Sequence, residues 1–498
     1  MIKHQYFVGL VALVFFIKVA IAFYLPLGND EVYYLTYARY PSYHYYDHPL
    51  LVGWFLKVFS LNLLVENTLL YRLFSLLLSL GATVLVYRSM LKIATPKAAQ
   101  LTVLLFLASL YNSVVAGLFI MPDAPMLFFW VLSVYLAILT FFDKSKLTLV
   151  NEKYFIPLCF SLGLTFLSKF HAVFLVFGIL GFITFYRSQF LKKWTFWEGI
   201  LVLVLFTLPV IIWNYYNNWV QFSFYANRTT NDVHLNWSGL SKELIGQVLY
   251  NNPIVFAFII FFGFISYNKI QRINKKAFLL WISLPFIFFI VIFSLFKETL
   301  PHWSGSSYVG LIMLAGLIAG EIENHWSALT WVRTSFSLLM LVFIAGFLLI
   351  NYFPGTLSNR KDTLSYGSGD FTLDMYGWDK IGLSVQHELE IKGYNKLPIV
   401  ADNWFPGAHI DEYIARPNNT PFFLLGDITK THHYQWVNDK RGNWRGIDSA
   451  IVIVPSNYYR DPSRSFQKYF NNVELVRLLP QYRNGELVRY FHIYLLTR

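Results

Sequence analysis

Cysteine is nearly absent from the sequence, since the chain of 498 residues holds only Cys159, which lies inside an apolar run. A single cysteine excludes an internal disulfide bond. A domain exposed outside the cell would therefore have to be stabilised by its own hydrophobic core.

Charged residues are also scarce, at 14% of the chain, while 56% of the residues are hydrophobic and 19% are aromatic. With a mean hydropathy of +0.46, this composition excludes an ordinary soluble protein and indicates a polytopic membrane protein. The formal net charge of +12 does not indicate a nucleic-acid partner, because no cluster of Lys and Arg lies on a polar domain and membrane proteins carry basic loops that fix their topology. We therefore expect membrane lipids as partners and no nucleic acid.

Long apolar runs are what the sequence does have, and they fill its first 353 residues. A helix that crosses a hydrocarbon layer of ~30 Å needs about 20 residues, and about eleven runs meet that length. The first lacks a small-residue cleavage site before Gly28, which favours a retained signal anchor. The sequence thus predicts a transmembrane domain over 1–353, with a first outer loop, 27–70, that holds interfacial helices. The runs lie near 6–26, 71–91, 99–120, 125–142, 154–170, 171–187, 197–213, 252–268, 277–296, 305–321 and 331–353.

Basic residues fall on alternate loops between these runs, for example at Arg88, Lys92 and Lys97 and then at Lys192. Because cytoplasmic loops carry an excess of Lys and Arg, this pattern predicts a cytoplasmic N-terminus. The loops that carry acidic and histidine motifs then lie outside, as does everything after Tyr352.

From residue 354 onward the composition is that of a soluble domain. A helix is expected around 406–415, between the first two of five apolar segments that predict strands. The sequence therefore predicts a C-terminal extracytoplasmic α/β domain over 354–498. Its predicted strands lie in LPIVADN, TPFFLLG, SAIVIVP, VELVRLLP and FHIYLLT.

Two adjacent carboxylates, Asp30 and Glu31, follow the first apolar run directly. Partial desolvation at a membrane surface raises the pKa of a carboxyl group, so one of them could act as a general base. The alternative is a capping box at the start of a membrane-surface helix with the sequence VYYLTYARY. The tyrosines between positions 33 and 46 are expected to lie mostly at the membrane interface.

A second polar motif, Asp47 and His48, precedes Pro49, a residue that suits the first turn of a helix. A phosphate bound there would meet backbone N–H groups and a protonated imidazole, so both residues are candidates for substrate binding. For Asp47 the alternative is a plain helix cap.

Taken together, five motifs resemble the bacterial branch of the GT-C glycosyltransferases. They are GNDEVYY at 28–34, YYDHPLL at 45–51, YRL at 71–73, PDAP at 122–125 and LSKFH at 167–171. The combination is most similar to glycosyltransferase family 39, which is akin to the protein O-mannosyltransferases and the lipid A aminoarabinose transferases. The resemblance implies an enzyme of a bacterial plasma (inner) membrane that moves a sugar, with inversion, from a polyprenyl-phosphate donor to a lipid, glycan or protein acceptor at the outer face.

The resemblance also implies roles for single residues. Asp30 matches the family's loop aspartate and would be the general base, with Glu31 in support. Asp123 resembles the second acidic residue of the site and would bind acceptor or sugar hydroxyls, unless it only caps the helix that Pro125 begins. Relatives often carry a lysine in place of His48, so the charge at this position depends on pH. The candidates for binding the donor phosphate are His48, Arg72, Lys169, His171, Arg228 and His302.

Two of these assignments have structural alternatives. Lys169 ends an apolar run, from which a lysine can extend to the membrane surface without binding a ligand. Trp303, which follows His302, suits an interfacial anchor as well as a sugar-stacking surface. No cofactor is expected to be required, and a divalent metal is not excluded because Asp30, Asp123 and His302 could converge, although no ligand spacing demands one.

Other classes of membrane protein make different predictions. A secondary transporter should show helices broken by Gly or Pro in two related halves, whereas the polar motifs here gather on one face of the membrane. A non-catalytic receptor for a lipid-linked glycan predicts that Asp30→Asn leaves function intact.

Overall fold

The computed structural model describes residues 3–142, 150–230, 234–269, 272–322, 325–442 and 444–498. The chain divides into two compact units, one made of 1–23 and 42–342 and the other of 24–41 and 343–498. The first is built of helices and is called the helical unit here. The second contains a five-stranded sheet and is called the sheet unit. Both units are discontinuous, because the segment 24–41 folds with the C-terminal part of the chain and not with the helices that flank it.

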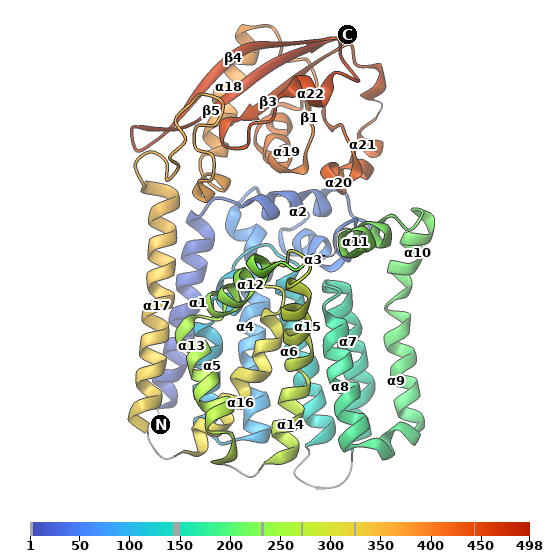
Figure 1. Ribbon diagram of the computed structural model, residues 1–498, viewed down its shortest axis with the longest axis vertical. Coiled ribbons are helices and arrows are strands. Elements are labelled where there is room, and N and C mark those ends of the chain that lie inside the picture. The colour runs from blue at the N-terminus through green and yellow to red at the C-terminus, as the bar shows by residue number, and fades with distance from the viewer. Residues whose placement is uncertain (1–2, 143–149, 231–233, 270–271, 323–324, 443) are drawn as a thin grey trace. The chain divides into compact units, whose positions relative to one another are not determined.

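Helices lie at each of the predicted apolar runs, as Figure 1 shows. Among the described residues, six helices or joined helix pairs are long and apolar enough to cross a membrane, or up to seven if one pair bent by 94° is a single span. The count of eleven stays a prediction. The helices at the runs are α1 (His4–Tyr24), α4 (Thr68–Ile93), α5 (Pro96–Ala108), α6 (Asp123–Phe141), α7 (Phe155–Ser168), α8 (Ala172–Tyr186), α9 (Trp194–Leu205), α10 (Leu208–Tyr216), α13 (Pro253–Phe258), α14 (Ile273–Trp281), α15 (Leu284–Ser294), α16 (Tyr308–Glu321) and α17 (His325–Tyr352).

Among the described residues of the helical unit, three α-helices fall outside the predicted runs: α3 (Leu51–Phe59), α11 (Val220–Thr230) and α12 (Trp237–Tyr250). Small residues let the long helices pack closely. A Cβ atom added to Gly316 on α16 would lie 2.0 Å from Thr102 Oγ1 on α5, and one added to Gly320 would lie 2.3 Å from Ala98 Cβ. The two backbones therefore approach as closely as small residues permit, a common means of packing helices in membranes.

The sheet unit contains all five predicted strands, β1 (Ile399–Ala401), β2 (Phe422–Leu424), β3 (Ser449–Pro455), β4 (Asn472–Arg483) and β5 (Glu486–Thr497). Their order is β2-β1-β3-β5-β4, with the first three parallel and β5 antiparallel to both neighbours. The predicted helix is confirmed as α19 (Trp404–Ile410), which continues as a π-helical turn, Asp411–Ala415. The remaining helices are α18 (Trp378–Ile391), α20 (Ile428–Thr431), α21 (Tyr434–Arg441) and α22 (Pro462–Phe466).

A tight turn joins β4 to β5 at Asn484 and Gly485, whose φ angles are +54° and +84°. Two-residue hairpin turns with positive φ at both positions favour Asn followed by Gly. The strands form one core with the helices, in which Val400, Val452 and Leu496 pack with Phe466. Strands β1 and β2 are buried at every position and β3 at all but its first, as expected for parallel strands covered on both faces.

Helix α2 (Asn29–Arg39) belongs to the sheet unit and is buried along most of its length. Tyr33, Tyr34 and Tyr37 are 3%, 4% and 0% exposed, and in the helical unit Tyr45 and Tyr46 are fully buried. The prediction that these tyrosines form an interfacial belt is therefore wrong. Their rings are core residues of the protein, because α2 is covered by protein rather than lying exposed at a membrane surface.

Polar contacts fix α2 at both of its ends and in its middle. At the C-terminal end, Arg39 forms a bidentate ion pair with Glu412, whose side chain is 5% exposed. Glu412 also accepts a hydrogen bond from Arg416 at 3.0 Å. The Tyr33 hydroxyl accepts the backbone N–H of His433 at 3.0 Å, and at the N-terminal end a ring nitrogen of His409 lies 3.0 Å from Asn29 Oδ1. Helix α2 is thus part of the sheet unit's own structure.

The first prediction concerns this ion pair. Glu412→Ala should destabilise the attachment of α2 by on the order of 3 kcal/mol, because it leaves two arginines, one of them mostly buried, without their carboxylate. Hydrogen–deuterium exchange of residues 29–39 should then be faster by more than tenfold. Glu388→Ala is the matched control, since Glu388 pairs with the half-exposed Arg477 in the same unit and exposed pairs contribute less than about 1 kcal/mol. Equal exchange in the two variants would contradict a specific role for Glu412.

Candidate active site

The helical unit contains a buried ion pair at the point where α6 begins and α7 ends. Asp123 is the first residue of α6 and is 0% exposed, and Lys169, the residue after α7, is 5% exposed. Lys169 Nζ donates to Asp123 Oδ2 at 2.8 Å and to Asp123 Oδ1 at 3.0 Å. Two motifs that lie 46 residues apart in the sequence, PDAP and LSKFH, therefore meet through one charge pair.

Tyr111 completes the set of donors to this carboxylate, since its hydroxyl donates to Asp123 Oδ1 at 2.9 Å. The Tyr111 ring is fully buried and packs against Gly305, where an added Cβ atom would lie 2.3 Å from the ring. Glycine at position 305 thus makes room for the ring that reaches Asp123. In the described part of the chain Asp123 accepts bonds only from Lys169 and Tyr111, so its alternative role as a helix cap is wrong.

Three histidines surround the ion pair, from the outer loop and from the segments before α8 and α16. Burial lowers the pKa of His48 to about 4, and the nearby Lys169 charge lowers it further while Asp47 and Asp123 raise it. Burial, followed by Lys169, likewise lowers the pKa of His302 to about 4. Both imidazoles are therefore neutral at pH 7 when no ligand is bound. The pH-dependent positive charge expected at position 48 then requires either a pH near 4 or an anion close to the ring.

His171 lies among aromatic rings, with centroid distances of 5.1 Å to Phe286 and 5.4 Å to Trp303. Its Nδ1 atom is buried and has no hydrogen-bond partner among the residues that the structure describes. His302 packs on Tyr250 of α12 at 5.6 Å. Trp303 therefore packs on a predicted site residue, and its role as a sugar-stacking surface or as an interfacial anchor stays a prediction.

A buried amide holds the loop that carries Asp47 and His48. Gln221 on α11 is 1% exposed and donates to the Tyr46 carbonyl at 2.7 Å. Its side-chain oxygen lies 2.9 Å from His44 Nε2 and accepts from Asn214 at 3.1 Å. Helix α3 begins at Leu51 with Leu50 as its cap residue, so Asp47 does not cap it. Asp47 lies instead in a turn before α3, in which the Tyr45 N–H donates to the His48 carbonyl.

A second polar network, which the sequence did not reveal, lies on α12 and fixes the segment before His302. Glu243 is 0% exposed and accepts from Thr299 at 2.5 Å and from Gln247 at 2.7 Å. Gln247 in turn accepts the Tyr308 hydroxyl at 2.6 Å. The available signal was an ionisable residue in an apolar helix, which is a functional candidate in membrane proteins. Tyr111 gave no such signal.

Four predicted residues, Asp30, Glu31, Arg72 and Arg228, are not among the partners named above for the Lys169–Asp123 pair. Asp30 is exposed on α2, and Glu31 is 3% exposed and accepts the Gly28 N–H at 2.9 Å, the return bond of a capping box. Arg72 is buried on α4, where it donates to the Ala22 carbonyl at 3.1 Å and lies over the Phe119 ring. Arg228 belongs to α11, but its side chain lies outside the described residues. The roles of these four in substrate binding or catalysis stay predictions.

Lys169 does not extend to the membrane surface, so that alternative is wrong: its ammonium group is buried because Asp123 compensates its charge. No group of three or more His, Cys, Asp or Glu side chains that could hold a metal ion occurs within residues 3–142, 150–230, 234–269, 272–322, 325–442 and 444–498. The convergence of Asp30, Asp123 and His302 on a metal is thus not found there.

Residues 47–213 match the family described as dolichyl-phosphate-mannose-protein mannosyltransferase. This segment contains the YYDHPLL histidine and the whole Asp123–Lys169 pair. No curated protein matches the chain.

Solved structures are similar over nearly the whole chain. ArnT from Cupriavidus metallidurans bound to undecaprenyl phosphate has a TM-score of 0.62 at 13% identity, over 98% of this chain and 97% of ArnT. ArnT in its apo state has a TM-score of 0.59 at 13% identity, over 99% of this chain and 97% of ArnT. A third structure is the archaeal oligosaccharyltransferase AglB from Archaeoglobus fulgidus, in complex with an inhibitory peptide and a dolichol-phosphate. It has a TM-score of 0.46 at 11% identity, over 90% of this chain and 69% of AglB. The predicted resemblance and fold class are confirmed: the chain has the GT-C glycosyltransferase fold, and its residues 47–213 match the dolichyl-phosphate-mannose-protein mannosyltransferase family.

Proposed function

We propose that the protein is an inverting glycosyltransferase that moves a sugar, a hexose or a pentose, from a polyprenyl-phosphate donor to an acceptor at the outer face of a membrane. The observation that carries this proposal is the buried Lys169–Asp123 pair with histidines around it. The family match over this segment supports it, as does the fold shared with ArnT, which has been solved with undecaprenyl phosphate bound. The acceptor is a hydroxyl or phosphate of a lipid, a glycan or a protein.

Lys169 is suited to hold the donor phosphate. An ammonium group has three N–H donors, and two of them are used by Asp123 in the structure. The third donates to a phosphate oxygen, while neutral imidazoles at His48, His171 and His302 donate further hydrogen bonds. As the bond from the anomeric carbon to the phosphate oxygen breaks, negative charge grows on the leaving polyprenyl phosphate, and a fixed cation stabilises that charge. Asp123 keeps Lys169 in position throughout.

Asp30 is proposed as the general base, as the family resemblance implies. It takes the proton from an acceptor hydroxyl while the acceptor oxygen attacks the anomeric carbon opposite the leaving phosphate, which gives inversion. If the acceptor is already an ionised phosphate, no proton needs to be removed, and Asp30 orients the acceptor instead. Its place on a helix that is anchored along its length favours a fixed geometry, which proton transfer requires.

The second prediction tests the base. Asp30→Asn should lower kcat by ~10²–10⁴-fold with the donor KM nearly unchanged, because a base acts only in the transition state. The measurement is release of polyprenyl phosphate from the lipid-linked sugar by the purified protein. Asp379→Asn is the matched control, since Asp379 is also an exposed carboxylate at the second position of a helix in the sheet unit. Full activity of Asp30→Asn would move the base to another residue, whereas a non-catalytic receptor predicts no release of polyprenyl phosphate even by the unmodified protein.

The third prediction tests the donor site. Lys169→Met alone leaves Asp123 buried without a cation, so the double variant Lys169→Met/Asp123→Asn is the better probe. It should unfold at a higher temperature than Lys169→Met and yet show a donor KM raised by more than tenfold, from the loss of a charge-assisted bond worth about 1.5–3 kcal/mol. Lys193→Met, at an exposed lysine, should leave the KM unchanged. A normal donor KM in the double variant would contradict phosphate binding by Lys169.

We further propose that the protein lies in the plasma (inner) membrane of a bacterium, with a cytoplasmic N-terminus and residues 354–498 on the outside. The alternation of basic loops supports this orientation. The chain offers a clean test, because its single cysteine is buried.

The fourth prediction is therefore that Gln467→Cys reacts with a membrane-impermeant thiol reagent in cells whose outer membrane has been permeabilised. Lys193→Cys should react only after lysis, because Lys193 is 60% exposed and lies beside Lys192 in a loop predicted to be cytoplasmic. The reverse pattern would overturn the orientation and with it the outer-face reaction.

A further inference from the structure

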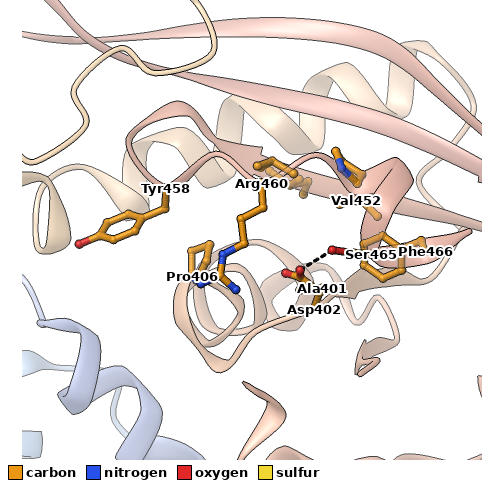
Figure 2. Close-up of a pocket in the computed structure, with 11 residues that line it drawn as sticks. Ala401, Asp402, Pro406, Val452, Tyr458, Arg460, Ser465 and Phe466 are labelled. Atoms are coloured by element: carbon orange, nitrogen blue, oxygen red, sulfur yellow. Dashed lines mark hydrogen bonds between the residues drawn. The ribbon is translucent and has the colours of Figure 1, made fainter. Parts of the chain in front are cut away.

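The sheet unit contains a cleft at the carboxyl ends of two parallel strands, β1 and β3 (Figure 2). The chain leaves β1 to form β2 on one side and later returns to form β3 on the other side. In open α/β sheets the crevice at such a reversal of strand order is the usual place for a ligand. The empty volume of about 370 Å³ includes the open mouth, so a ligand there would lie against an open surface and would not be enclosed.

The walls of the cleft combine opposite charges with an apolar floor. Asp402, the residue after β1, accepts a hydrogen bond from Ser465 on α22 at 2.6 Å. Arg460 lines the same cleft from the segment that follows β3. Figure 2 shows Tyr458, Arg460 and Asp402 in that order across it. The floor is apolar and consists of Ala401, Val452, Ile453, Val454 and Phe466.

These two charges do not neutralise each other within the part of the chain that the structure describes. Asp402 is hydrogen-bonded there to Ser465 alone, and Arg460 forms neither an ion pair nor a side-chain hydrogen bond. A carboxylate accepts about four hydrogen bonds and a guanidinium donates five. Both groups therefore keep most of their hydrogen-bonding capacity for a ligand in the cleft.

Tyr458 supplies a fixed aromatic surface. Its ring is 40% exposed, and its hydroxyl donates to Asp374 at 2.9 Å. The ring also packs edge to face on Phe405, with centroids 4.5 Å apart. An exposed ring held from two sides offers contact area at little cost in side-chain entropy.

From this combination we propose that the cleft binds a saccharide. A sugar ring presents an apolar C–H face, which Tyr458 can cover, and a rim of hydroxyls that donate to Asp402 and accept from Arg460. A phosphate or nucleotide fits less well, because the carboxylate of Asp402 repels it and the loop after β1 has no glycine-rich turn to surround it. The cleft bears one charge of each sign, which suits a neutral ligand.

The role of this saccharide rests on the proposed function, under which it is a sugar unit of a glycan acceptor. The binding itself does not rest on it. An experiment on binding alone can therefore fail or succeed independently of the glycosyltransferase activity.

The fifth prediction is measured by saturation-transfer difference NMR on the full chain in detergent, with the methyl glycosides of mannose, galactose and N-acetylglucosamine as probes. At least one probe should receive saturation, most strongly at the ring protons of one face. Asp402→Asn and Arg460→Ala should each weaken its binding about tenfold, the loss expected when a charge-assisted hydrogen bond is replaced or removed.

Arg464→Ala is the control, because Arg464 is 88% exposed, lies on the same short helix as Ser465 and does not line the cleft. The Arg464→Ala variant should bind the probe as tightly as the unmodified protein does. Arg460 is on the surface, so its variant keeps the fold, and an unchanged thermal midpoint in each variant separates lost binding from unfolding. The proposal is overturned if no probe receives saturation, or if Asp402→Asn and Arg460→Ala both bind as the unmodified protein does.

Discussion

The ion pair between Lys169 and Asp123 is the interaction on which the rest of the helical unit's polar site depends. Burying either charge alone among apolar helices costs several kcal/mol of desolvation free energy. In the pair, the attraction between the two charges and the added hydrogen bond from Tyr111 offset this cost. Because Asp123 begins α6 and Lys169 follows α7, the same bonds fix the relative position of two helix ends. Tyr111, which donates to Asp123, also packs its ring against Gly305. It thereby connects the ion pair to the segment that carries His302.

A different constraint governs the helix that carries Asp30. Helix α2 follows the first apolar run in the sequence, yet its tyrosines and Arg39 are buried among residues more than 350 positions later. The sheet unit therefore holds α2 through specific contacts. It determines the conformation of the segment to which the family resemblance assigns the base, and this gives the C-terminal part of the chain a direct physical connection to the proposed chemistry.

The sequence predicted the parts of the structure that follow from local patterns. Apolar run length located the long helices, and short apolar segments such as SAIVIVP located the strands, because these signals depend on few neighbours. Asp123, Lys169 and His302 were named as site candidates through the resemblance to the GT-C glycosyltransferases. The burial of Tyr33 and Tyr37 could not be found in this way, since it depends on contacts with 404–434. Tyr111 and Glu243 were missed because their roles rest on single hydrogen bonds to other elements, from Tyr111 to Asp123 and from Thr299 to Glu243.

A cryo-electron microscopy structure of the protein in nanodiscs with bound polyprenyl phosphate would show where the lipid-linked phosphate binds. If Lys169 holds the phosphate while Asp123 keeps Lys169 in place, a phosphate oxygen lies within about 3 Å of Lys169 Nζ, the usual length of such a bond, and the bond from Lys169 to Asp123 is still formed. A phosphate bound elsewhere, with no contact to Lys169 or to the histidines around it, would rule out this role for Lys169.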